Sequence, residues 1–347
     1  MAKFNRPEKK DDNVEKIVAL IENEIENGEL EPIEQKPIAW EEIPVISTGS
    51  TLLDLSISGG RTETGGIPAC ILAEIYGPAG SGKTSVLATV GGNAQTMGLG
   101  VHMQDPEERV DKEYSRIYEI ELDKSNYSRP RTVEEVFDFL GKNKPGVLLT
   151  DSLAALTTEL EQETGDKMGM RRAKLFSAGL RVNAGVVSQM LWLCSNQERQ
   201  GDKGFFVPGG KAIEYYSSLR VRIYQKRIIE IEKTNAYGVK LKKAIGIQSE
   251  CLVKKSTVDD PYRLCPIYII FGYGIDDVRG NLQYLKDMQN LTGYPTPDGK
   301  KFRGIEQAIE YVEKNGLQEK LKKETISMWR EIDEMFKTYK RSRKNEY

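Results

Sequence analysis

The stretch GPAGSGKT at residues 77–84 has the residue types and spacing of a phosphate-binding loop. An apolar strand pattern ends at Tyr76, and a helix-forming run begins at Thr84. Glycines at such a junction permit a tight turn whose backbone N–H groups face a phosphate. In this role the Lys83 ammonium reaches the β- and γ-phosphates of a nucleotide, and the Thr84 hydroxyl ligates Mg²⁺. The predicted nucleotide-binding residues are Gly77, Pro78, Ala79, Gly80, Ser81, Gly82, Lys83, Thr84 and Ser85.

A carboxylate for the same metal ion stands at the end of another strand pattern. The segment PGVLLTDS at 145–152 is apolar and ends in Asp151. In P-loop enzymes a carboxylate at this place holds the magnesium shell. Thr84 and Asp151 are therefore the expected Mg²⁺ ligands.

Polar residues at two further strand ends have the chemistry to act on water and on a terminal phosphate. In MQDPEERVD, at 103–111, a strand pattern ends near Glu107 and Glu108, and strand ends in such sheets line the ligand crevice. We expect Glu107 to be the general base, although spacing alone separates it neither from Glu108 nor from a solvated loop glutamate. LCSNQ, at 193–197, places Asn196 and Gln197 at another strand end. There an amide either senses the γ-phosphate or belongs to an ordinary turn.

The elements that must position these residues alternate along the chain. Short apolar runs and amphipathic stretches follow one another from Ile46 onward, which favours an α/β fold with a mainly parallel sheet. Two later strand patterns joined by a basic turn predict an antiparallel extension of that sheet. The apolar runs occupy 71–76, 100–104, 147–150 and 190–194, the amphipathic stretches include 133–140, and the later strands occupy 219–231 and 249–252.

Three parts of the chain are expected. Residues 1–45 hold an amphipathic helix pattern at 13–27 and a proline-containing linker, residues 46–273 form the core, and residues 274–347 form a small C-terminal domain. Helices are predicted there at 281–291, 304–315 and 318–339. The basic end KTYKRSRKNEY is either solvated or contacts a phosphate backbone.

Composition excludes several classes of protein. The single histidine and four cysteines without CxxC spacing indicate neither a zinc site nor a disulfide framework. No run approaches the roughly 20 apolar residues of a membrane span, and the start has no apolar signal region. We therefore expect a cytoplasmic protein with no membrane partner. The formal net charge of -2 neither predicts nor excludes a polyanion partner.

Taken in order, the motifs resemble those of the RecA family of recombinases, and the resemblance covers most of the chain. The matching segments are ISTGSTLLDL at 46–55, EIYGPAGSGKT at 74–84, VDKEYSR at 110–116, TDSLAALT at 150–157, GDKMG at 165–169, SNQ at 195–197 and PGGKAIEYYSSLR at 208–220. The resemblance implies a RecA-like P-loop ATPase core that uses ATP and Mg²⁺. It further implies filaments on single-stranded DNA that catalyse pairing and strand exchange with homologous duplex DNA, with single-strand-binding and mediator proteins as further partners.

The resemblance also implies roles for individual residues around the nucleotide. Glu107 falls where the family places its catalytic glutamate, and it acts with Lys83 and Gln197. Tyr114 would stack on adenine, and Gln197 would couple the γ-phosphate to the loop after it. Lys254 or Lys255 would reach ATP across the subunit interface.

Two DNA-facing loops follow from the same comparison: the first DNA loop at 159–169 and the second DNA loop at 197–210. The first carries Met168 as a wedge between bases, and the second is glycine-rich and expected to be flexible, with Phe205 or Phe206 as a wedge. The basic residues after the first loop have a solvated helix face as their alternative explanation. The predicted DNA-binding residues are Met168, Gly169, Arg171, Arg172, Arg199, Lys203, Phe205, Gly209, Gly210 and Lys211.

The N-terminal helix would be the polymerisation surface, since heterologous contacts of this kind build helical filaments. Departures from the family pattern are a shorter second DNA loop, a Ser256 or Thr257 in place of one expected lysine, and a basic tail. They favour a divergent branch, similar to the phage-encoded UvsX. The alternatives are a ring helicase or translocase on the same core and a mediator that binds ATP without hydrolysing it.

Overall fold

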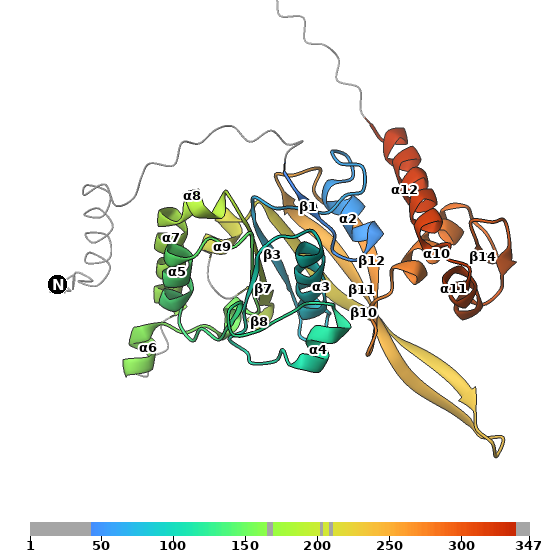
Figure 1. The fold of residues 1–347 in the computed structure, drawn as a ribbon, viewed down its shortest axis with the longest axis horizontal. Helices are drawn as coiled ribbons and strands as arrows, with labels where there is room; N and C mark the ends of the chain where they lie inside the picture. The colour runs from blue at the N-terminus through green and yellow to red at the C-terminus, as the bar shows by residue number, and fades with distance from the viewer. Residues whose placement is uncertain (1–42, 165–168, 202–203, 208–210, 338–347) are drawn as a thin grey trace, which may run out of the picture. The chain divides into compact units, whose positions relative to one another are not determined.

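The computed structural model describes residues 43–164, 169–201, 204–207 and 211–337, which Figure 1 draws as a coloured ribbon. The predicted N-terminal helix at 13–27, most of the linker and the basic tail from 338 lie outside the described residues. Within the part described, no helix has both the length and the apolar character that a membrane crossing requires.

A large central sheet dominates the described residues, with nine strands in the order β13-β12-β11-β10-β3-β7-β6-β4-β5. Neighbours from β10 to β5 run parallel, and those from β10 to β13 run antiparallel. The expected α/β class with a mainly parallel sheet is confirmed. The strands are β3 Leu72–Gly77, β4 Val101–Gln104, β5 Tyr127–Ser128, β6 Val147–Thr150, β7 Leu191–Gln197, β10 Leu219–Thr234, β11 Lys240–Ser256, β12 Leu264–Ile270 and β13 Gly274–Ile275.

Shorter elements connect and cover this sheet. The paired strands outside it are β1 Val45–Ile46 with β2 Ile67–Pro68, β8 Arg199–Gly201 with β9 Gly204–Phe206, and β14 Tyr294–Pro295 with β15 Lys301–Phe302. Among the described residues before 220, the helices are α2 Thr51–Ser58, α3 Lys83–Thr96, α4 Lys112–Ile117, α5 Val133–Lys142, η2 Leu153–Ala155, α6 Glu159–Thr164, α7 Gly169–Val182, α8 Ala184–Val187 and α9 Lys211–Tyr216.

Side chains on opposite faces of the sheet form two apolar cores, because successive residues of a strand point to opposite sides. Ala73 of β3 and Leu193 of β7 belong to one core together with Leu87 of α3. Trp192 of β7 belongs to the other core with Phe176 of α7. Every residue of β3 and β6 is buried, as expected for strands covered on both faces.

The antiparallel extension is longer than the sequence predicts. Strands β10 and β11 pair from Leu219↔Ser256 to Thr234↔Lys240, and Figure 1 shows their paired ends leaving the rest of the sheet. The connecting turn shrinks to the residues around Gly238, where the Asn235 side chain accepts the backbone N–H groups of Tyr237 and Val239. These two hydrogen bonds close the turn between the ends of β10 and β11.

Three helices follow the sheet, namely α10 Asp277–Met288, α11 Ile305–Lys314 and α12 Gln318–Met335. They share a small apolar core that includes Leu282 and Val312. Helix α10 begins four residues before the predicted start because Asp276 caps it, accepting a hydrogen bond from the Arg279 backbone N–H. The described residues from 43 to 337 belong to one compact unit, and the boundary at 273/274 stays a prediction.

Candidate functional site

The phosphate-binding loop joins β3 to α3, and close packing requires glycine at two of its positions. The loop residue Gly82 has φ +97, a conformation that side-chain-bearing residues rarely adopt. A Cβ added there would lie 2.1 Å from Ile269 Cδ1, and one at Gly77 would lie 1.9 Å from the Ile223 carbonyl oxygen. Strands β10 and β12 therefore pack closely against the loop, which lines a cavity of about 450 Å³.

Lys83 lies inside the loop rather than in solvent. Its Nζ donates to the carbonyl oxygens of Gly77 at 3.1 Å and Pro78 at 2.7 Å. Burial lowers the pKa of Lys83, and the carboxylates of Asp151 and Glu107 act in the opposite direction. The ammonium is thus placed at the wall of the cavity where a phosphate would meet it.

Asp151 stands at the end of β6 and is buried beside the loop. Its carboxylate accepts hydrogen bonds from the hydroxyls of Ser195 and Thr84. Burial raises the pKa of Asp151, and those two hydrogen bonds oppose the rise. One carboxylate next to one hydroxyl fits Mg²⁺, which takes few protein ligands and completes its shell with phosphate and water. Among the described residues there is no group of three or more metal-ligating His, Cys, Asp or Glu side chains.

Glu107 is the centre of a hydrogen-bonded group at the edge of the cavity. Its Oε1 accepts from Ser152 Oγ at 2.5 Å and from Gln197 Nε2 at 3.0 Å. Its Oε2 pairs with Arg109 Nε at 2.8 Å. The structure thereby brings two of the predicted catalytic side chains, Glu107 and Gln197, into direct contact.

The neighbouring glutamate points elsewhere. Glu108 has φ +55, which turns the chain after Glu107. Its carboxylate pairs with Arg129 Nη1 at 3.2 Å, and both side chains are about half exposed. Glu107 lines the cavity and Glu108 does not, which separates two residues that spacing alone left equivalent.

Asn196 and Gln197 also have different surroundings, because successive residues of a strand point to opposite sides. Asn196 is buried, and its Nδ2 donates to Glu74 Oε1 at 3.0 Å. Glu74 also accepts from Arg220 Nε at 2.6 Å, so Asn196 belongs to a structural polar cluster under the sheet end. Gln197 alone of the two amides lines the cavity.

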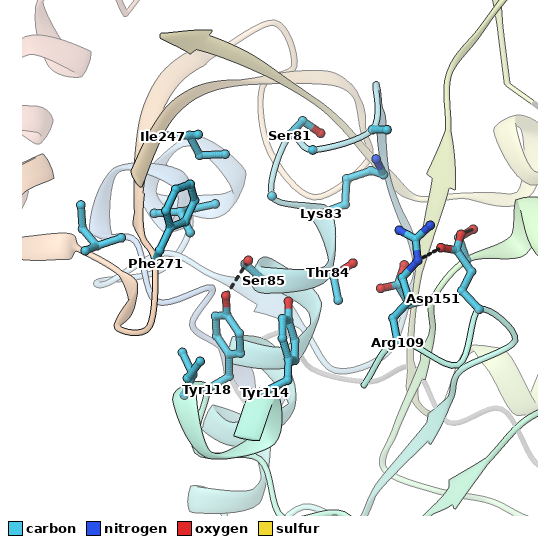
Figure 2. Close-up of a pocket in the computed structure, with 18 of the residues that line it drawn as sticks. Ser81, Lys83, Thr84, Ser85, Arg109, Tyr114, Tyr118, Asp151, Ile247 and Phe271 are labelled. Carbon is cyan, nitrogen blue, oxygen red and sulfur yellow. Dashed lines mark hydrogen bonds and ion pairs between the residues drawn. The ribbon is translucent and has the colours of Figure 1, made fainter. Parts of the chain in front are cut away.

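Aromatic and aliphatic side chains form the far end of the cavity. The rings of Tyr114 and Tyr118 lie 4.7 Å apart, and Tyr118 Oη donates to Ser85 Oγ at 2.7 Å. Figure 2 shows Ile247 and Phe271 on the side of the cavity facing away from Asp151, above these two tyrosines. An adenine ring fits such an apolar end, with Tyr114 available for stacking.

Several lining residues had not been singled out in the sequence. The segment FGYG at 271–274 follows an apolar run at 264–270. A strand pattern followed by two glycines indicates a strand end, and this pattern could have identified Phe271 as a candidate lining residue. The missed lining residues include Arg109, Tyr118, Ile247, Phe271 and Gly272.

The two candidate lysines on β11 do not line this cavity. Lys255 Nζ donates to the carbonyl oxygens of Glu214 and Tyr215, both at 2.8 Å, at the end of α9. Burial lowers the pKa of Lys255. Lys254 is exposed, so the two neighbours occupy different environments.

Part of the second DNA loop is paired strand, and its expected flexibility stays a prediction. Strands β8 and β9 pair antiparallel with the register Arg199↔Phe206 and Gly201↔Gly204, so a short hairpin continues directly from β7. Lys203, Gly209 and Gly210 lie outside the described residues, and only the backbone is described for Phe205, Phe206 and Lys211.

The first DNA loop is described in part. Helix α6 ends at Thr164, and α7 begins at Gly169, so Met168 lies outside the described residues. Arg171 and Arg172 occupy the first turn of α7 and are partly exposed. The predicted basic helix is present.

Comparison with known proteins decides the family. A family model described as the RecA N-terminal domain matches residues 12–276. The chain belongs to the RecA family. Members of this family are ATP-dependent DNA recombinases, and the chain is assigned that activity with its family.

Individual relatives of this RecA-family chain match along most of its length. Protein RecA of Rippkaea orientalis is 30% identical over 330 residues, which cover 90% of this chain and 89% of that protein. Protein RecA of an Arthrobacter species is 33% identical over 251 residues, or 69% of this chain and 68% of that protein. Protein RecA of Ruminococcus albus is 29% identical and covers 81% and 70%. The phage-encoded branch stays a prediction.

Proposed function

We propose that this RecA-family chain assembles on single-stranded DNA as a helical filament and uses ATP and Mg²⁺ at the loop around Lys83 to control its hold on the strand. One observation carries the proposal. Gln197 contacts Glu107 in the cavity, and the strand that bears Gln197 runs directly into the β8–β9 hairpin of the second DNA loop. The nucleotide and the DNA therefore share one structural element.

Hydrolysis would proceed by in-line attack of water on the γ-phosphorus. The water oxygen forms a bond to phosphorus while the bond from phosphorus to the β–γ bridging oxygen breaks, releasing ADP and phosphate. Glu107 takes the proton of the attacking water and passes it to solvent. Lys83 stabilises negative charge on the phosphates, and Mg²⁺, when held by Thr84 and Asp151, supplies Lewis-acid stabilisation of the same charge.

Glu198, the residue that follows β7, anchors the end of this strand. Glu198 pairs with Arg222 of β10 through two hydrogen bonds, 3.1 Å to Nε and 2.8 Å to Nη2. The Glu198 backbone N–H donates to the Gly77 carbonyl at 3.0 Å. With its backbone held at Glu198, β7 stays in place when a γ-phosphate draws the Gln197 amide away from Glu107, so the Gln197 side chain moves rather than the strand.

The intersubunit part of the site is proposed to use Lys254. Lys255 already donates to two carbonyl oxygens of its own chain, whereas Lys254 is exposed on β11. The helix at 13–27 is proposed to join successive subunits. Single-stranded DNA, homologous duplex DNA, single-strand-binding and mediator proteins are the proposed partners, and the cytoplasm is the proposed location.

The deciding experiment compares Glu107→Gln with the wild-type chain. The variant should lose ATP turnover and keep ATP-dependent binding of single-stranded DNA, because the amide cannot accept the proton but preserves the shape of the site. Strand exchange by the wild-type chain should require ATP. Normal turnover by the variant would refute the assignment of the base, closed rings in electron micrographs would indicate a helicase, and absent DNA-stimulated hydrolysis would indicate a mediator.

A further inference from the structure

Arg109 is a cation at the cavity that the nucleotide motifs leave unexplained. It follows β4 on the same loop as Glu107 and lines the cavity. Figure 2 shows it on the same side of the cavity as Lys83 and Asp151. Its charge contributes to lowering the pKa of Lys83, after the larger effect of burial. Two cations and the proposed general base therefore meet where the terminal phosphate would lie.

The ion pair of Arg109 with Glu107 is asymmetric. The Arg109 side chain is 64% exposed, and that of Glu107 is 11% exposed. A pair with so exposed a guanidinium contributes little to stability and leaves the arginine able to change partner. The carboxylate, in contrast, is held in place by Ser152 and Gln197.

The arrangement limits how Glu107 can act as a base. Oε1 already accepts two hydrogen bonds, which use its two lone pairs. Oε2 keeps one lone pair for a proton from water, and Arg109 donates to the other. A doubly charged phosphate competes strongly for a guanidinium, because charge-assisted hydrogen bonds to phosphate are strong and often bidentate.

We propose that Arg109 is a phosphate-binding residue of the ATPase site that moves from Glu107 Oε2 to the γ-phosphate, releasing the base and adding a second cation beside Lys83. The proposal rests on the ATPase activity of the proposed function. It makes the arginine selective for a triphosphate, since a diphosphate has no group at the γ position. The same movement takes a cation away from Oε2, so Glu107 becomes a stronger proton acceptor when the phosphate to be cleaved is present.

The ion pair of the neighbouring glutamate, Glu108, supplies a matched control. Arg129 pairs with Glu108 at 3.2 Å, with both side chains about half exposed, and neither residue lines the cavity. Arg129→Gln removes the same type of ion pair without touching the proposed phosphate site.

The test uses full-length protein on single-stranded DNA and compares Arg109→Gln, Arg109→Lys and Arg129→Gln. Single-turnover ATP hydrolysis should fall about 100-fold in Arg109→Gln, the loss typical of one donor to transition-state charge. Arg109→Lys should fall less, because it keeps the charge without the planar fork. Arg129→Gln should stay within about twofold of wild type. Binding of a non-hydrolysable ATP analogue should weaken roughly tenfold in Arg109→Gln relative to ADP binding, since only the triphosphate reaches the guanidinium.

The outcomes separate this proposal from the proposed function. If the wild-type chain hydrolyses ATP on DNA and Arg109→Gln retains its rate and its preference for triphosphate, Arg109 is only a surface ion pair. A faster Arg109→Gln would make the arginine an inhibitor of Glu107 and would also overturn the proposal. If the wild-type chain does not hydrolyse ATP, the proposed function fails, and an unchanged triphosphate preference would then refute Arg109 as a phosphate ligand. Should Arg109→Gln not fold, the same comparison is made with Arg109→Lys.

Discussion

Gln197 Nε2 donates a hydrogen bond to Glu107 Oε1 at 3.0 Å, across 90 residues of sequence. The contact joins the end of β7 to the loop after β4, although β6 lies between these strands in the sheet. It places the residue that leads into the second DNA loop on the proposed general base.

Shortening the amide should uncouple the nucleotide from DNA. Gln197→Asn lacks one methylene and cannot reach Glu107 from the same backbone position. The ratio of single-stranded DNA affinity with ATP to that without should fall toward 1, as measured by fluorescence anisotropy of a labelled oligonucleotide. Gln189→Asn, at an exposed position, is the control. A full ATP-dependent gain in Gln197→Asn would show that this contact carries no coupling.

The Glu198–Arg222 pair should stabilise the end of β7 measurably. The Glu198 side chain is 7% exposed and that of Arg222 is 28% exposed, and two charge-assisted hydrogen bonds join them. A double-mutant cycle with Glu198→Gln and Arg222→Gln, followed by urea unfolding, should give a coupling of about 1 to 2 kcal/mol. The exposed Lys240–Glu232 pair should give roughly 0 to 0.5 kcal/mol. Equal coupling in the two cycles would contradict the anchoring role.

Mixed filaments should reveal a lysine acting between subunits. Glu107→Gln and Lys254→Ala should each lack turnover when alone. A random equal mixture should recover roughly a quarter of wild-type turnover, because one interface in four then combines an intact Glu107 with a neighbour's intact Lys254. Lys255→Ala should instead lose about 1 kcal/mol of stability, since it removes donors from the end of α9. No recovery in the mixture would place Lys254 outside the neighbour's site.

Asp54 should make the fold less stable as pH rises. It is buried in α2 and accepts hydrogen bonds from Ser47 Oγ and from both the N–H and the hydroxyl of Thr48. Burial raises the pKa of Asp54 to about 6, so the folded chain keeps a proton that the unfolded chain releases near pH 4.

This proton stabilises the folded state below about pH 4, and the contribution is lost as pH rises through about 6, amounting to on the order of 2 to 3 kcal/mol. Asp54→Asn has no proton to lose. Urea unfolding at pH 4 and pH 7 should therefore show a smaller fall in the free energy of unfolding for the variant than for wild type. An identical fall in both would place the titration elsewhere.

Local patterns in the sequence were sufficient for much of this protein. The strand, glycine turn and helix around Lys83 lie next to one another in the chain, and their chemistry depends on adjacent residues. Strands that are buried on both faces have continuous apolar runs, and these runs predict a parallel sheet. Asp151 could be identified because it directly follows one of these apolar runs. The resemblance to the family motifs then pointed to Glu107, Gln197 and the segments expected to face DNA.

Only the tertiary structure decided which side chains meet. Glu107 faces the cavity and Glu108 does not because the chain turns through a positive φ at Glu108, a local conformation that residue type does not specify. Gln197 reaches Glu107 because β4, β6 and β7 become neighbours through pairing between distant segments. The same long-range packing brings Phe271 to the cavity opposite Asp151. The pairing of Arg109 with the proposed base and of Lys255 with α9 likewise depends on how separate elements pack, which no short stretch of sequence records.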